Sequence, residues 1–195
     1  MAKVKGPLLS MDARGKIANS IVFGGWKGIQ TVRQYVIPAN PETQKQIDAR
    51  ALMTAAVGKW RDPSLLVADK QAWDAYAPTL AARMSGFNAF CKTWIDVSNA
   101  GKTPLLLVEF SLDDSEGEKI SVEVKTTTGK QVTCYWGSKP SRLDNSNVMA
   151  DNAGTYSYTI ENLTPLTTIY VACVVTSAGF AGSRTGILSA TVAEA

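Results

Sequence analysis

The chain has 195 residues, of which 45% are hydrophobic and 19% are charged, and its formal net charge is +3. This length suits one or two domains with hydrophobic cores of their own, and no apolar run approaches the roughly 18 residues that a membrane-spanning helix needs. There is no histidine, and the three cysteines are not clustered, so the commonest general base and the usual metal-ligand spacings are missing. We therefore expect no enzyme, no cofactor and no metal site.

Composition divides the chain in two near residue 101. Residues 1–101 hold 13 Lys and Arg against 7 Asp and Glu, whereas residues 102–195 hold 7 and 10. Four of the five tryptophans and the helical patterns lie upstream, and alternating Thr- and Val-rich runs lie downstream. The sequence predicts an α+β protein with one domain over 1–101 and a second over 102–195.

The N-terminal part predicts a basic arm followed by a β-hairpin. Residues 1–14 are expected to be extended, and residues 16–23 and 29–37 alternate like strands around a glycine-rich loop at 24–28. A lone hairpin is marginal in water, so it needs helices or a partner's sheet to cover it. No N-terminal apolar segment resembles a secretory signal, and synthesis in the cytoplasm is expected. The candidate partner-docking residues are Lys3, Lys5, Arg14, Lys16, Trp26, Lys27, Arg33 and Tyr35.

Three helices are expected after the hairpin. Asn40 and Pro41 are predicted to cap the first, whose apolar stripe runs from Ile47 to Trp60, and Asp62 with Pro63 is predicted to cap the second. Pro78 should end the second helix, and Ser85 should cap the third. The aromatic residues recur at helical spacing and are interpreted as one core rather than a ligand cage: Trp60, Trp73, Tyr76, Phe87, Phe90 and Trp94.

The second part predicts short strands separated by turns. They are expected at 105–112, 118–126, 131–137, 155–162, 168–176 and 187–193, a spacing typical of a β-sandwich. Cys91 is expected in a helical core, while Cys134 and Cys173 fall in strands and are interpreted as buried thiols. A disulfide between Cys134 and Cys173 is the alternative.

The run Leu163-Thr164-Pro165-Leu166-Thr167, followed shortly by Tyr170, resembles a fibronectin type III domain. The resemblance covers residues 104–195 and implies an immunoglobulin-like sandwich. It also implies that Pro165 lies in the turn before the penultimate strand, and that Tyr170 is a tyrosine corner whose hydroxyl ties back to that turn.

Residues 6–98 resemble an uncharacterised family of tailed-phage and prophage proteins. The motifs that carry the resemblance are Trp26-Lys27-Gly28, Pro38-Ala39-Asn40-Pro41 and Ser85-Gly86-Phe87-Asn88-Ala89-Phe90. The resemblance implies a virion component made in the host cytoplasm. Immunoglobulin-like domains are also common appendages of phage heads and tails.

These observations favour a non-enzymatic structural protein of a bacteriophage virion. The N-terminal module would dock on capsid, tail or connector proteins, in many symmetric copies, and the sandwich would be displayed as a decoration domain. The alternative is a DNA-binding accessory protein that uses the basic module, because Lys and Arg interleaved with Trp26 and Tyr35 could neutralise phosphates and stack on bases. The loop at 24–28 lacks the spacing and the Lys-Ser/Thr ending of a phosphate loop.

Overall fold

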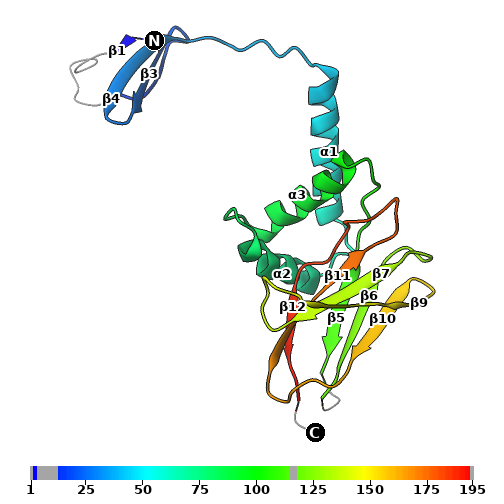
Figure 1. The fold of residues 1–195 in the computed structure, drawn as a ribbon. Coiled ribbons are helices and arrows are strands. Elements are labelled where there is room, and N and C mark those ends of the chain that lie inside the picture. Colours follow the sequence, from blue (N-terminus) through cyan, green and yellow to red (C-terminus); the bar gives the residue numbers. More distant parts are fainter. Residues whose placement is uncertain (1, 4–12, 115–117, 194–195) are drawn as a thin grey trace. The chain divides into compact units, whose positions relative to one another are not determined.

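The computed structural model describes residues 2–3, 13–114 and 118–193, which form two compact units. The first unit ends at Thr43, and the second runs from Gln44 to the end of the chain. Figure 1 shows the segment after strand β4, without helix or strand, that joins them.

The first unit is a small antiparallel sheet. Its strands are β1 (Ala2–Lys3), β2 (Gly15–Ile17), β3 (Ile21–Trp26) and β4 (Ile29–Gln34), in the order β1-β4-β3-β2. A two-residue turn, Lys27-Gly28, joins β3 to β4, and both of its residues have positive φ, which Gly28 adopts without a steric cost.

The prediction of a single strand over residues 16–23 is wrong, because these residues belong to two strands, β2 and β3. Ala18 and Asn19 also adopt positive φ, so the chain reverses there and Lys16 pairs with Val22. Gly24 and Gly25, predicted as loop, lie inside β3.

The second unit begins with three helices that meet in an aromatic cluster. They are α1 (Gln44–Trp60), α2 (Val67–Tyr76) and α3 (Gly86–Asn99), and the 3-10 helix η2 (Ala77–Thr79) holds Pro78 where α2 ends, as predicted. The predicted core is confirmed by ring pairs 5.3–5.9 Å apart that link Trp60, Trp73, Tyr76, Phe87, Phe90 and Trp94. Helix α1 joins this core through its last turns, where Ala56 is buried, whereas Ile47 at the other end of the predicted stripe is 45% exposed.

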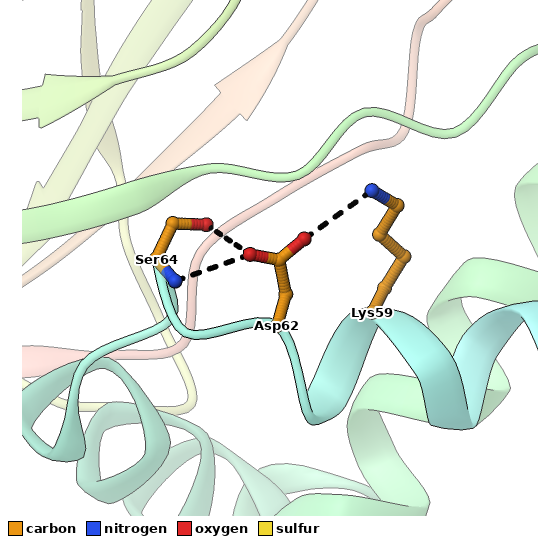
Figure 2. A network of polar contacts seen from close by, with 3 residues as sticks. All are labelled: Lys59, Asp62 and Ser64. Carbon is orange, nitrogen blue, oxygen red and sulfur yellow. Dashed lines mark hydrogen bonds and ion pairs between the residues drawn. The ribbon is translucent and has the colours of Figure 1, made fainter.

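Two of the three predicted helix caps are wrong. Helix α1 begins at Gln44, beyond Asn40 and Pro41, because Glu42 has positive φ and interrupts a helix there; the Asn40 amide donates to the Glu42 carboxylate instead. Asp62 precedes α2 by several residues and closes its own turn. It accepts from the Ser64 backbone N–H at 3.1 Å and the Ser64 hydroxyl at 2.7 Å, and pairs with Lys59 (Figure 2). Ser85 does cap α3, as predicted.

The rest of the second unit is a sandwich of two antiparallel sheets. One contains β5 (Val108–Asp113), β6 (Ile120–Lys125), β9 (Ala150–Asn152) and β10 (Thr155–Ile160), in the order β5-β6-β10-β9. The other contains β7 (Val132–Gly137), β8 (Asn145–Val148), β11 (Thr168–Val175) and β12 (Leu188–Thr191), in the order β12-β11-β7-β8. This is the strand arrangement of an immunoglobulin-like sandwich, with β8 added beside β7. The predicted fold class, α+β with such a sandwich, is confirmed.

Alternating side chains of both sheets fill the sandwich core. Val122 and Tyr156 from one sheet and Val171 from the other are fully buried. Cys134 and Cys173 lie directly opposite each other on β7 and β11 as buried free thiols, so the predicted thiol state is the one observed.

Pro165 occupies the expected turn before β11, where Leu166 has positive φ. The predicted tyrosine corner is not found among the described residues, because the Tyr170 hydroxyl makes no hydrogen bond with any of them. The hydroxyl of Tyr156 on β10 is tied to the backbone at a different place, the connection between β6 and β7. The buried ring of Tyr156 brings the hydroxyl to within 2.9 Å of the Lys130 N–H and 3.1 Å of Asp151.

The helices and the sandwich are one compact unit, so the predicted boundary at 101–102 differs from the structural division between Thr43 and Gln44. The buried Asp69 carboxylate on α2 accepts from the backbone N–H groups of Glu109 and Phe110 on β5, at 3.2 and 2.9 Å. The Ile187 N–H donates to the Ala72 carbonyl of α2 at 2.9 Å, and a side chain at Gly186 would collide with the backbone of Ala72. The change in composition near residue 101 therefore marks a change of secondary structure and not the end of a domain.

Candidate docking surface

One face of the N-terminal sheet gathers basic and aromatic side chains. Lys16 pairs with Val22, Val22 pairs with Arg33, and Trp26 pairs with Ile29. Direct cross-strand partners share a face, and residues two apart along a strand do too. The Lys16 ammonium also lies 4.6 Å from the centre of the Tyr35 ring. We call the resulting surface the basic face; it consists of Lys16, Val22, Trp26, Ile29, Arg33 and Tyr35.

The basic face is hollowed at one end. A cavity of about 730 Å³ lies beside Lys16, Val22, Arg33 and Tyr35, and the apolar side chain of Val36 borders it. At the opposite end, the Trp26 side chain is 72% exposed, with the Lys27 ammonium 6.0 Å from its ring centre. An exposed cation–π pair contributes about 0.5–1 kcal/mol, which holds the lysines over the rings without removing their charge.

The N-terminal sheet has no core of its own among residues 13–43, because none of them is buried. The opposite face is apolar and partly open, with Ile17 43% and Ile21 40% exposed. The sheet also ends in β2, which pairs only with β3 in the part of the chain that the structure describes. The unpaired edge offers backbone N–H and C=O groups to another strand.

The structure brings most of the predicted docking residues together. Trp26, Lys27, Lys16, Arg33 and Tyr35 lie on the basic face or at its turn. Arg14 differs, because its guanidinium lies beside Gly25, which belongs to the opposite face. Lys3 is in β1 and pairs with Thr31, while Lys5 lies outside the described residues.

The electrostatics of this unit are one-sided. Four basic side chains, Arg14, Lys16, Lys27 and Arg33, stand among residues 13–43 against a single acid, Glu42. Such a surface attracts acidic protein surfaces or phosphates at a range set by the Debye length, about 8 Å at physiological salt.

The described residues of the second unit contain no group of three His, Cys, Asp or Glu side chains that could hold a metal ion, and its three cysteines are buried. No described helix is both long and apolar enough to cross the bilayer. Sequence reasoning did miss one feature, Arg184, which lies partly buried against the Tyr76 ring. An isolated arginine carries no motif, and only the fold places it beside an aromatic ring.

No protein-family model matches the chain, and no curated protein matches it. Solved structures of low similarity do match about half of it. A fibronectin type III domain of human contactin 1 has 15% identity and a TM-score of 0.39, covering 48% of this chain and 84% of that one. The sixth fibronectin type III domain of human fibronectin type III domain containing protein 3 has 18% identity and a TM-score of 0.34, covering 44% and 82%. The sensor domain of the anti-sigma factor RsgI4 of Pseudobacteroides cellulosolvens has 14% identity and a TM-score of 0.35, covering 48% and 98%.

Proposed function

We propose that this protein is a non-enzymatic structural component of a bacteriophage virion. The N-terminal sheet docks on other virion proteins, and the helical and sandwich unit is displayed as a decoration domain. The phage assignment is supported by the resemblance of Trp26-Lys27-Gly28 and the motifs after it to a family of tailed-phage proteins. The head surface is the first location proposed, and the tail or the connector is the second.

The observation that carries the docking role is the incomplete burial of the N-terminal sheet. A four-stranded sheet becomes stable by covering an apolar face, yet none of residues 13–43 is buried and Trp26, Ile17, Ile21 and Ile29 are 40–72% exposed. A partner that covers these side chains would supply the missing burial.

The chemistry of the sheet indicates the partner. The free edge of β2 suits addition to a neighbour's sheet, and the basic face suits an acidic protein surface. One such contact is small, because the sheet has only a few residues per strand. Many symmetric copies on a particle would convert a weak single contact into stable attachment.

Particle composition and attachment test the proposal. Mass spectrometry of purified particles should find the chain in many copies, and its absence from particles would refute the virion role. The double variant Trp26→Ala with Arg33→Gln should lose attachment to particles that lack the protein. The matched control, Val148→Ala with Lys119→Gln, removes an exposed apolar and a basic side chain from the sandwich and should attach normally.

The basic face also favours a second candidate, a nucleic-acid-binding accessory protein. If Lys16, Lys27 and Arg33 on this face and its turn contacted phosphates, the logarithm of the affinity for duplex DNA would fall with the logarithm of salt concentration with a slope of roughly −3. A gel shift that shows this slope would favour DNA. No shift at low salt would eliminate this candidate and leave the protein-docking role.

A further inference from the structure

A second cavity, of about 310 Å³, lies in the helical and sandwich unit. It is built on the outer face of the sheet that contains β7 and β11, where Tyr135 pairs with Ala172; their neighbours Cys134 and Cys173 point into the core. The end of α2, with η2, forms one wall, and the loop between β7 and β8 forms another. The residues that matter here are Tyr76, Thr79, Tyr135, Ser141, Leu143 and Arg184.

Arg184 places an uncompensated cation at this cavity. Its guanidinium carbon lies 3.9 Å from the centre of the Tyr76 ring, and its Nε donates to the Thr185 carbonyl at 3.1 Å. No Asp or Glu among the described residues forms an ion pair with it. Partial burial lowers the pKa of Arg184 from its usual range, and the nearby Tyr76 hydroxyl opposes that shift. The group remains protonated at neutral pH, since arginine holds its proton in proteins.

The walls around Arg184 are held in place before any ligand arrives. Tyr76 packs edge-on against Trp73, with ring centres 5.7 Å apart, so the stacked guanidinium has a fixed platform. The β7–β8 loop is closed by a hydrogen bond from the Arg142 N–H to the Lys139 carbonyl at 3.1 Å. That loop lies so close to β7 that a side chain at Gly137 would collide with the Arg142 carbonyl.

The charge and shape of the cavity select one class of ligand. The lining has one cation and no acid. The single positive charge balances a ligand with one negative charge, but it would neutralise only half of the charge of a phosphate dianion. Pro140 and Leu143 supply apolar surface, and the exposed Ser141 hydroxyl can donate to a ligand, whereas the Thr79 hydroxyl already donates to the Tyr76 carbonyl at 2.7 Å. We propose that this cavity binds a small organic carboxylate, with the Arg184 guanidinium paired to the carboxylate and the apolar body of the acid against Pro140 and Leu143. A planar guanidinium and a carboxylate match in geometry and form two parallel hydrogen bonds.

The test is a titration of the full isotope-labelled chain with benzoate, followed by two-dimensional NMR at constant ionic strength. Benzoate should shift the amide signals of Thr79, Ser141 and Leu143 saturably, with a Kd on the order of 1 mM for a ligand of this size. Benzamide has the same shape without the charge and should bind at least about tenfold more weakly. This comparison needs no variant.

Variants then assign the effect to Arg184. Arg184→Gln should weaken benzoate binding at least about tenfold, whereas Arg83→Gln, on an exposed turn, should leave it unchanged. Thermal unfolding of each variant checks that it is folded. The peptide acetyl-Gly-Glu-Gly-amide distinguishes the source of the carboxylate: tighter binding than benzoate would assign it to a polypeptide side chain, and weaker binding to a free acid. Equal binding of benzamide and benzoate, or unchanged benzoate binding by folded Arg184→Gln, would overturn the proposal.

Discussion

Replacement of Asp69 tests the finding that the helices and the sandwich form one folded unit. The Asp69 side chain is 4% exposed and accepts from three backbone N–H groups, at Leu66, Glu109 and Phe110. The last two lie at a bulge, between Val108 and Ser111, where the pairing of β5 with β6 shifts register. The bulge interrupts the regular pairing of β5 with β6, and the N–H groups exposed by it donate to the Asp69 carboxylate on α2.

The expected cost of Asp69→Ala follows from these contacts. A donor left unsatisfied in a buried position costs about 1–3 kcal/mol, and two of the three donors lie at the partly buried bulge. Relief from burying a carboxylate offsets part of that cost. We expect the free energy of unfolding to fall by about 3 kcal/mol. Asp69→Asn keeps one carbonyl oxygen as acceptor and should lose about 1–2 kcal/mol.

Urea unfolding is the measurement, followed both by tryptophan fluorescence and by circular dichroism in the far ultraviolet. Tryptophan reports mainly on the aromatic cluster of the helices and circular dichroism on all elements, so coincident curves for the second unit would show that helices and sandwich unfold together. Asp96→Ala is the control, since Asp96 is exposed on α3 and, among the described residues, its carboxylate forms an ion pair only with Lys92 on the same helix; the substitution should change stability by less than about 0.5 kcal/mol. A loss below about 1 kcal/mol for Asp69→Ala, or separate transitions for helices and sandwich, would refute the reasoning.

Three further predictions concern close packing, a turn and the thiols. Gly186→Ala should destabilise the protein by more than about 3 kcal/mol in the same urea assay, because its Cβ would collide with the Ala72 backbone, whereas Gly58→Ala, in open space on α1, should stabilise it by about 0.5–1 kcal/mol. Hydrogen bonds from the Ser64 hydroxyl and N–H lower the pKa of Asp62. This turn therefore stabilises the fold above the unfolded pKa near 3.8, and that contribution is lost as the pH falls through the folded pKa. Ser64→Ala should raise the pKa of Asp62, measured by carboxyl carbon NMR, and an unchanged pKa would contradict this cause. A thiol reagent should label no cysteine in the native protein and all three in urea, and fast labelling of native protein would show that the buried thiols become accessible.

Periodic apolar patterns predicted the well-buried elements. Phe87, Phe90, Cys91 and Trp94 recur at the spacing of one helix face, and α3 presents Phe90 and Cys91 to the core. The strands that cross the sandwich were found for the same reason, since Val122 and Val124 alternate with more exposed residues. When one face of a helix or strand is buried, its apolar residues recur in the sequence at the period of that element.

Elements without a buried face left no such period. Strands β8 and β9 have every residue exposed, and the sequence predicted no strand between residues 137 and 155. The turn at Ala18-Asn19 was missed because alanine rarely adopts positive φ, and no glycine or proline marks the reversal. The hydrogen bonds of Asp69 with Glu109 and Phe110 join residues about 40 positions apart, and no local sequence pattern predicts such long-range contacts.

The structural division also sharpens the meaning of the charge asymmetry. Residues 1–43 contain 6 Lys and Arg against 2 Asp and Glu, while residues 44–195 contain 14 and 15. Within the second unit, residues 44–101 hold 7 Lys and Arg against 5 Asp and Glu, and the acidic excess of residues 102–195 more than offsets them, so the net positive charge of the whole chain comes from the N-terminal unit. That unit is also the one in which none of residues 13–43 is buried, whereas the second unit covers a core of its own. A partner with an acidic surface would supply both the missing burial and the opposite charge, so the proposed docking role fits residues 1–43 better than the whole of residues 1–101.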